Sequence, residues 1–260
     1  MLLDWFRQKR RVYTIESASL SDRGLVRADN QDHVVAYRGR ASFCVADGMG
    51  GGEGGAKASE LVCRHFVKAV VARRGFADRI RRVAEAIDRA NADIRDFADG
   101  AGYRQMGSTV AALVLDEGAS FQAIVAHVGD SRVYRYRAGV LEQLTRDHTM
   151  ASELTRRACG ATAAAALAGR TSVLSHVLTR AIGIEDTVKV DWRRVDFRAG
   201  DQFLVCSDGV YDMIDHDGIR KAFAQGGRPR DVVERLAAGV VRGGAADNYS
   251  IVVLRLGAKR

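Results

Sequence analysis

The chain has 260 residues, of which 47% are hydrophobic and 28% charged, and it contains a single proline. This composition is typical of a folded globular protein and excludes a disordered or fibrous chain. No apolar run approaches the ~20 residues that a membrane-spanning helix needs. The start, MLLDWFRQKRR, lacks the apolar segment and cleavage site of a secretory signal, so we interpret residues 1–11 as a basic tail.

Basic residues outnumber acidic ones, 40 against 32, which gives a net charge of +8. They cluster at residues 7–11, 79–82, 132–137 and 228–230. We interpret these clusters as solvated surface, because the sequence contains no zinc-finger or RNP pattern. The sequence therefore predicts no nucleic-acid partner, although a basic surface attracts acidic or phosphorylated proteins.

The cysteines lie far apart in the sequence and form no C-x-x-C pair: Cys44, Cys63, Cys159 and Cys206. Two of them, Cys44 and Cys206, lie in apolar runs, where a thiol behaves as a small buried hydrophobe. This pattern indicates a reduced, cytoplasmic protein rather than one that depends on disulfides.

The first part of the chain is predicted to form strands at residues 13–20, 32–37 and 41–47. Apolar residues then recur at helical spacing over residues 56–73. They do so again from Asp78, the expected helix cap, to Gly100. Three strands followed by two long helices are therefore expected.

Two hairpins are predicted in the next segment. STVAALVL and ASFQAIVAHVGD flank a turn at residues 116–118, and SRVYRYR and VLEQL flank Ala138-Gly139. Turns this short require antiparallel pairing, because parallel strands need a long crossover.

The segment at residues 147–182 is alanine-rich and weakly patterned, so we interpret it as an insertion outside the core, with a helix over residues 149–158. Three more strands and two helices complete the chain, at residues 188–195, 202–207 and 249–256 and at residues 217–225 and 229–241. The strands on either side of the two long helices must pair with one another, since neither set forms a good sheet alone. We expect one domain over residues 12–258.

The most unusual stretch is FCVADGMGGGEGG, in which an apolar strand stops at Asp47 and glycines follow. It matches G-x-G-x-x-G from Gly50 to Gly55, but a second helix comes where the dinucleotide-binding fold needs a second strand. A Walker A loop needs Gly-Lys-Ser/Thr, which is missing, and Glu53 stands where phosphate would lie. Neither phosphate-binding motif explains these glycines.

Four apolar strands each have an aspartate at one end: Asp47, Asp130, Asp208 and Asp247. An aspartate there is usually part of a turn, and for Asp130 a hairpin turn remains a competing interpretation. Four carboxylates converging at one rim of a sandwich would repel one another unless cations neutralised them. Oxygen ligands without clustered histidine or cysteine favour Mg²⁺ or Mn²⁺. The glycines would let a backbone carbonyl, that of Gly48, approach the ion.

Eight motifs follow one another in the order SDRGLVRADNQD, VADGMGGGEGGAKAS, MGSTV, VGDSRVYRYR, LTRDHT, VLTRAIG, LVCSDGVYDMI and DNYSIVV. In this order they resemble the metal-dependent Ser/Thr protein phosphatases of the PP2C (PPM) family, in its bacterial form, over residues from about 14 to 256. The resemblance implies an α+β fold, a central antiparallel β-sandwich flanked by helical pairs in α-β-β-α layers. It also implies a binuclear Mn²⁺ or Mg²⁺ centre.

The ligands of the two ions are implied by the same resemblance. Asp47 resembles the carboxylate that bridges both ions, and the Gly48 carbonyl resembles a ligand of the second. Asp208 and Asp247 resemble the other carboxylates of the first ion. Asp32 resembles the acid that holds the second ion through water.

Two further roles follow from the resemblance. Asp130, with Asp208, resembles the ligand pair of a weaker third ion found in bacterial members. Arg27, four residues before Gln31, resembles the arginine that binds the substrate phosphate, although a surface salt bridge is the alternative.

The chain departs from the family pattern at three positions. Met49 stands where animal members have a histidine proposed as general acid, Gln31 replaces a more usual glutamate, and Ser108 replaces a commoner threonine. Residues 148–180 correspond to a flap beside the cleft, a segment that varies across the family.

The implied function is hydrolysis of phosphoserine and phosphothreonine in proteins by a hydroxide that bridges the two ions, opposing bacterial Ser/Thr kinases. The expected partners are phosphorylated proteins, including such a kinase, and the expected state is a monomer. Two alternatives stay open: a non-catalytic module of the same fold that binds a phosphoprotein, and a nucleic-acid binder. We expect His127 in the core and assign no chemistry to His148 or His176.

Overall fold

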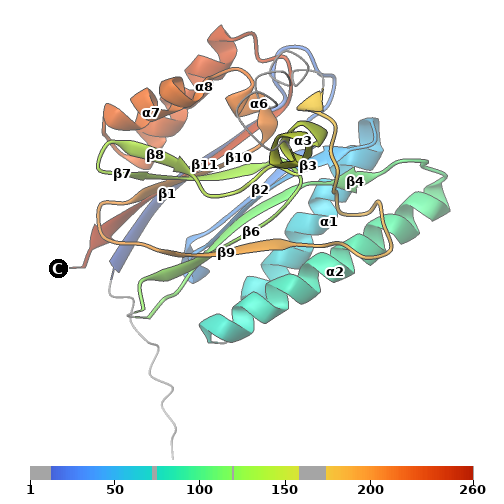
Figure 1. Cartoon of the computed structure of the whole chain (residues 1–260), viewed down its shortest axis with the longest axis horizontal. Helices are drawn as coiled ribbons and strands as arrows, with labels where there is room; N and C mark the ends of the chain where they lie inside the picture. Colours follow the sequence, from blue (N-terminus) through green and yellow to red (C-terminus); the bar gives the residue numbers. More distant parts are fainter. Residues whose placement is uncertain (1–12, 72–74, 119, 158–173, 260) are drawn as a thin grey trace, which may run out of the picture.

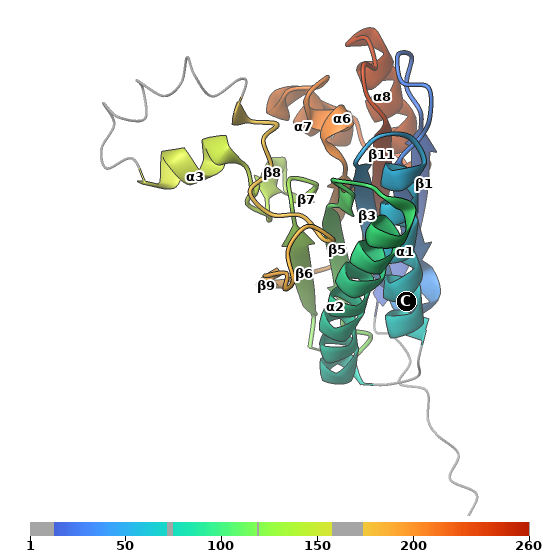
Figure 2. The same cartoon turned by 90° about the vertical axis from the view of Figure 1, so that its right-hand side faces the viewer.

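Two antiparallel sheets pack face to face, and helices cover the outer face of each (Figures 1 and 2). The computed structural model describes residues 13–71, 75–118, 120–157 and 174–259. The basic tail at residues 1–11, the middle of the predicted insertion and Cys159 lie outside these residues. None of the helices within them is long and apolar enough to cross a membrane.

The strands of each sheet combine distant parts of the chain. The first sheet has the order β1 (Tyr13–Asp22), β11 (Tyr249–Ala258), β10 (Gln202–Cys206), β7 (Arg132–Arg137), β8 (Val140–Gln143). The second has the order β2 (Asp32–Tyr37), β3 (Ser42–Met49), β5 (Val110–Leu115), β6 (Gln122–Val128), β9 (Asp191–Asp196), with the short β4 (Gly107–Ser108) paired to β3. The predicted pairing across the two long helices is confirmed, because β3 pairs with β5 and β1 with β11.

Helices form the two outer layers. The second sheet is covered by α1 (Gly52–Val71) and α2 (Phe76–Ala101), and the first by α7 (His216–Ala224) and α8 (Pro229–Arg242). Three shorter helices complete the described part: η1 (Arg38–Arg40), α3 (Met150–Arg157) and α6 (Asp208–Tyr211). The predicted α-β-β-α layering is confirmed.

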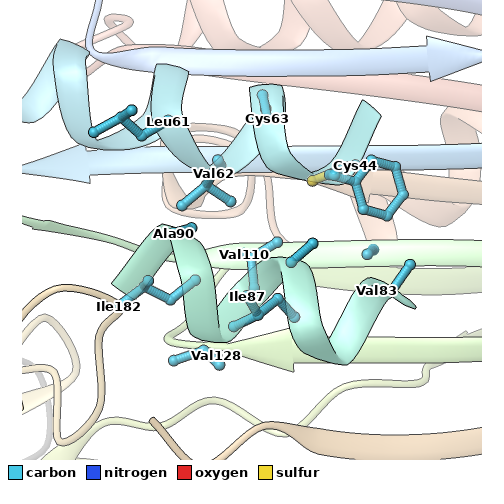
Figure 3. Packing of buried hydrophobic residues seen from close by; sticks show 14 of the residues in the cluster. Cys44, Leu61, Val62, Cys63, Val83, Ile87, Ala90, Val110, Val128 and Ile182 are labelled. Carbon is cyan, nitrogen blue, oxygen red and sulfur yellow. The ribbon is translucent and has the colours of Figure 1, made fainter. Parts of the chain in front are cut away.

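The apolar core is layered in the same way. Phe43 and Val45 of β3 pack in the cluster between the two sheets, whereas Cys44 and Ala46 pack in the cluster that contains α1 and α2. Figure 3 shows Cys44 in this second cluster. Because alternate residues of a strand point to opposite faces, a strand covered on both sides must be apolar throughout. This explains the unbroken apolar runs of β3, β5 and β10.

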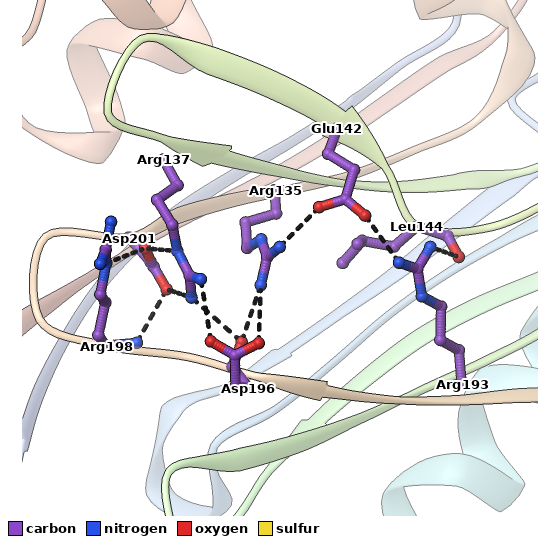
Figure 4. A network of polar contacts seen from close by, with 8 residues as sticks. All are labelled: Arg135, Arg137, Glu142, Leu144, Arg193, Asp196, Arg198 and Asp201. Atoms are coloured by element: carbon purple, nitrogen blue, oxygen red, sulfur yellow. Dashed lines mark hydrogen bonds and ion pairs between the residues drawn. The ribbon is translucent and has the colours of Figure 1, made fainter.

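A polar network joins the edges of the two sheets (Figure 4). Arg137 of β7 donates to Asp196 of β9 at 2.9 Å and to Asp201 at 2.7 Å. Glu142 of β8 accepts from Arg135 at 2.6 Å and from Arg193 of β9 at 2.7 Å. The basic cluster at residues 132–137 therefore crosslinks the sandwich.

The interpretation of the basic clusters as solvated surface was wrong for the cluster at residues 132–137, whose arginine side chains are 14–21% exposed. It was also wrong for Arg79, which is only 1% exposed. Its guanidinium donates to the carbonyl oxygens of Arg40 and Leu115, the latter at 2.9 Å. Arginine is buried here because two backbone carbonyls, one at the end of η1 and one at the end of β5, need donors.

Some predicted boundaries were also wrong. α1 begins at Gly52 rather than residue 56, because Gly54 packs against the ring of Tyr103 and allows the helix to start within the glycine run. Asp78 is not the cap of α2. The cap is Gly75, and Asp78 lies in the first turn, where it pairs with Arg81 at 2.8 Å.

Candidate active site

A cavity of about 1520 Å³ opens at one end of the sandwich. Its floor comes from the end of β3, the β6–β7 turn, the start of α6 and the residues before β11, which contribute Asp47, Asp130, Asp208 and Asp247. The segment at residues 176–189 forms part of its wall. The four aspartates that the sequence placed at strand ends therefore line one cavity.

Asp32 lies beside Asp47 on the neighbouring strand, because the β2–β3 register pairs these two residues. Asp32 is 4% exposed, and the Ser207 hydroxyl donates to its Oδ2 at 2.7 Å. Its Oδ1 is buried and accepts no hydrogen bond from the described residues. Burial raises the pKa of Asp32 to about 6.

Asp47 and Asp208 meet at the centre of the floor. Burial raises the pKa of the Asp47 carboxyl well above its usual range, and repulsion by Asp32 and Asp208 raises it further. Burial does the same to the pKa of Asp208, with added repulsion from Asp130. Both Asp47 and Asp208 are half-buried. Without a compensating cation, the repulsion between neighbouring carboxylates favours protonation of some of them.

Asp130 fits both interpretations that the sequence left open, a residue of a hairpin turn and a carboxylate of the cation site. It follows Gly129, whose φ of +92° makes the tight β6–β7 turn, and the residue is 4% exposed and lines the cavity. Burial raises the pKa of Asp130 to about 6.

Arg27 reaches the cavity from an exposed loop. Its Nη2 donates to Asp247 Oδ2 at 2.6 Å, and this hydrogen bond raises the pKa of Arg27. The side chain is 56% exposed, so the guanidinium can still meet a ligand from solvent. The salt bridge that the sequence analysis gave as the alternative role of Arg27 is therefore present, and the partner of Arg27 in it is Asp247, one of the cavity carboxylates.

The loop that carries Arg27 is held by Asn248, which is 6% exposed. Its Nδ2 donates to the carbonyls of Arg23 at 2.9 Å and Asp29 at 2.8 Å, and its Oδ1 accepts from the Gln31 amide at 2.9 Å. Sequence reasoning missed this role. The adjacency of Asn248 to Asp247 was the available signal.

The glycine run packs closely around Gly48. A Cβ on Gly48 would lie 1.9 Å from the carbonyl oxygen of Gly55, so no other residue fits. With its side-chain amide oriented to satisfy both ends, Gln31 donates to the Gly48 carbonyl and accepts from the Gly52 amide, each at 3.0 Å. The glycines therefore serve backbone packing beside the carboxylates.

The donors around the floor fit hard divalent cations. They are carboxylate and carbonyl oxygens, which Mg²⁺ and Mn²⁺ prefer. Carboxylates that bind a cation should have an unpartnered oxygen or a raised pKa when the cation is missing. Asp32 Oδ1 has no hydrogen-bond partner among the described residues, and the pKa values of Asp47 and Asp208 are raised.

Sequence reasoning also missed His176 and Asp212, which line the same cavity. His176 Nδ1 lies 3.5 Å from Asp212 Oδ2, and with Asp208 these residues offer three ligand atoms within 4.8 Å of one another. No sequence signal placed His176 here, because it lies in the weakly patterned segment that was interpreted as an insertion.

A second histidine-containing group, His127, His148 and Asp191, also brings its ligand atoms within 4.8 Å. His148 Nδ1 accepts from the Gly129 amide at 3.1 Å, so the ring hydrogen of the neutral form is on Nε2 and faces Asp191. Burial lowers the pKa of His148 to about 4, which keeps the ring neutral. A histidine that binds a metal through Nε2 usually carries its ring hydrogen on Nδ1 and donates it. In His148, Nδ1 is instead an acceptor. The group is therefore better explained as structural. His127 is 6% exposed, as expected of a core residue.

Comparisons with known proteins agree on one family. Residues 18–238 match the family model described as protein phosphatase 2C. The chain is 30% identical to the protein phosphatase PhpP of Streptococcus pneumoniae, over 93% of this chain and 98% of that protein. It is 32% identical to the serine/threonine protein phosphatase PstP of Mycobacterium tuberculosis, over 94% of this chain and 45% of that protein.

Solved structures give the same result. The chain is similar to PppA, described as a key regulatory component of T6SS in Pseudomonas aeruginosa, with a TM-score of 0.82 and 30% identity over 95% of this chain and 100% of that one. It is also similar to the catalytic domain of PstP in complex with two manganese ions, with a TM-score of 0.81 and 31% identity over 94% of this chain and 99% of that one.

Proposed function

The chain belongs to the protein phosphatase 2C family, and on that premise we propose that this cavity hydrolyses phosphoserine and phosphothreonine in proteins with two divalent cations. One observation carries the proposal: carboxylates from four separate strand ends line one cavity beside an arginine that solvent can reach. Structural carboxylates are normally distributed to avoid such repulsion, so their gathering favours cation binding.

The ions would be held by the floor of the cavity. We propose Asp47 as the bridging ligand, Asp208 and Asp247 as ligands of the first ion, and the Gly48 carbonyl and, through water, Asp32 as ligands of the second. Asp130 with Asp208 would hold a weaker third ion. When bound, the ions supply a nucleophile by acidifying water and neutralise charge on the phosphoryl group.

Arg27 would bind the phosphate. Its guanidinium offers a planar pair of donors that matches two phosphate oxygens. In the structure it bonds to Asp247, so a substrate phosphate and Asp247 would compete for it. Binding of a cation by Asp247 would weaken this salt bridge and free Arg27 for the substrate.

Covalent catalysis by a side chain is not proposed. Among the described cysteines, burial raises the pKa of Cys44 and Cys206, so neither is an activated thiolate. Met49 lines the cavity but has no proton to donate, and we propose that water in the open cavity protonates the leaving group.

The proposed substrates are phosphorylated cytoplasmic proteins, among them a Ser/Thr kinase, with Mn²⁺ or Mg²⁺ as cofactor. The net charge of +8 favours acidic and phosphorylated partners over neutral ones. The described cysteines are all free, which fits a reducing compartment.

The test is hydrolysis of a phosphothreonine peptide with Mn²⁺, with chelator, and by the Asp208→Asn variant. We expect the wild-type rate to depend on Mn²⁺ and the variant to lose on the order of 10³-fold, since metal stabilisation of the transition state is worth several kcal/mol. Asp88→Asn, on the exposed face of α2, is the matched control and should keep full activity. Undiminished hydrolysis in chelator would contradict the proposal, and peptide binding without turnover would favour the non-catalytic alternative.

A further inference from the structure

A polar network next to the cavity contains three side chains that the proposed function does not use. They are Arg132 at the start of β7, Asp147 after β8 and Tyr211 at the end of α6. None of these three residues lines the cavity. The network nevertheless joins two elements that carry carboxylates of the floor, because Arg132 comes two residues after Asp130 and α6 begins at Asp208.

Arg132 is held in one orientation by its ion pair. Its Nη2 donates to Asp147 Oδ2 at 2.6 Å and its Nε donates to Asp147 Oδ1 at 3.0 Å, so the guanidinium and the carboxylate form a bidentate pair. Its Nη1 donates to the Tyr134 hydroxyl at 2.9 Å. The side chains of Arg132 and Asp147 are 21% and 15% exposed, so water competes little for these hydrogen bonds. The plane of the guanidinium is therefore fixed.

The guanidinium of Arg132 lies over the ring of Tyr211, with its central carbon 3.4 Å from the ring centroid. A cation this close to the face of an aromatic ring is attracted to it. The Tyr211 hydroxyl in turn donates to the backbone carbonyl of Asp130 at 3.1 Å. Tyr211 therefore joins α6 both to β7 and to the β6–β7 turn that carries Asp130.

The helix α6 depends on such contacts for its position. It has only four residues, Asp208–Tyr211, and a helix this short is not stable by itself. Val210 packs in the apolar core, and Tyr211 adds two contacts that have a direction, a hydrogen bond and a stacked cation. Because Asp208 and Tyr211 lie at opposite ends of this one turn, a shift of Tyr211 would move Asp208 relative to Asp130.

Stability alone is a weak reason for this network. A buried ion pair is often no more stable than well-packed apolar residues of the same volume. A bidentate pair differs from an apolar contact because it fixes a direction. Residues that orient metal ligands without touching the metal usually act in this way, through hydrogen bonds to the ligands or to the backbone that carries them.

We propose that Arg132 is a positioning residue of the cation centre. Together with Asp147 it orients the ring of Tyr211. The ring and its hydroxyl then hold Asp130 and Asp208 at the separation that a shared cation needs. The proposal rests on the proposed function in taking these two carboxylates as cation ligands, and Arg132 itself touches neither the ions nor the substrate.

The experiment measures Mn²⁺ binding to the full chain by equilibrium dialysis, which gives the number of ions and their affinities without turnover. Arg132→Lys keeps the charge but loses the bidentate pair and the planar stack. It should weaken at least one Mn²⁺ site by about tenfold or more, as loss of a residue that orients a metal ligand does. Arg135→Lys is the matched control and should keep the wild-type affinities. Arg135 lies on the same strand, is 14% exposed and pairs with Glu142 at 2.6 Å, away from the cavity.

Tyr211→Phe is a milder variant that keeps the ring beneath the guanidinium and removes only the hydrogen bond to the Asp130 carbonyl. It should weaken the same site by about two- to tenfold, the value of one hydrogen bond. With a phosphothreonine peptide, Arg132→Lys and Tyr211→Phe should regain the wild-type kcat at high Mn²⁺ while KM stays unchanged, because Arg27 is not altered. A merely structural role would lower the melting temperatures of Arg132→Lys and Arg135→Lys in chelator alike and leave their Mn²⁺ affinities equal, and this result would overturn the proposal.

The two claims fail in different ways. Equal Mn²⁺ affinities of wild type, Arg132→Lys and Tyr211→Phe would overturn the positioning role, whereas Mn²⁺-dependent hydrolysis by the wild type would still support the proposed function. Conversely, a wild type that binds Mn²⁺ without hydrolysing the peptide would sink the proposed function alone, provided that Arg132→Lys still weakens the binding.

Discussion

Replacing Asp32 with asparagine should stabilise the metal-free protein increasingly as pH rises. Burial raises the pKa of Asp32 from 3.8 to about 6, a difference worth about 3 kcal/mol at ~1.4 kcal/mol per pH unit. Because the folded pKa lies above the unfolded one, the folded state binds the proton more tightly. Stability is therefore lost as pH rises through about 4 to 6 and the carboxyl ionises. Asparagine resembles the protonated carboxyl and removes this dependence.

Urea unfolding of chelator-treated protein measures the effect. Asp32→Asn should have a higher free energy of unfolding than wild type, and this difference should grow by about 2 kcal/mol between about pH 4.5 and about pH 7.5. The control variant Asp88→Asn should show no such growth. Saturating Mn²⁺ should reduce or reverse the difference, because an ion that binds only the folded state stabilises the wild type more. A difference that does not change with pH would refute the claim that burial raises the pKa of Asp32.

Three further substitutions test the other parts of the site. Arg27→Ala should raise KM for a phosphothreonine peptide by about 10–100-fold, the value of one or two charge-assisted hydrogen bonds, and an unchanged KM would exclude phosphate binding. Gly48→Ala should cost at least about 1–3 kcal/mol in thermal unfolding, because its Cβ would lie 1.9 Å from the Gly55 carbonyl oxygen. Gly100→Ala, with nothing within 4 Å, is its control and should be neutral or stabilising. Asn248→Ala should lower stability by about 2–4 kcal/mol and raise KM, because it releases three backbone groups of the loop that carries Arg27; unchanged urea unfolding would contradict the role of this amide.

Much of the fold followed from local patterns. The turn Ala138-Gly139 is too short for anything but an antiparallel hairpin, and β7 and β8 pair as predicted. The aspartates converge because strand ends of a sandwich share a rim, and the sequence showed each aspartate at such an end.

Other features depended on contacts between distant residues, which a pattern does not record. Arg79 looks like surface charge in the sequence, yet it is buried because the carbonyls of Arg40 and Leu115 lie where only tertiary packing brings them. His176 is separated from Asp208 in the sequence by two strands, β9 and β10, and its segment has no periodicity that predicts where the side chain lies. The role of Asn248 likewise appears only when the loop before β2 folds over it.

Anomalous diffraction from crystals grown with Mn²⁺ tests the central claim most directly. We expect two strong manganese peaks that share a carboxylate oxygen donor from Asp47, one of them also in contact with Asp208 and Asp247. A map at full manganese saturation with no peak among these side chains would contradict it.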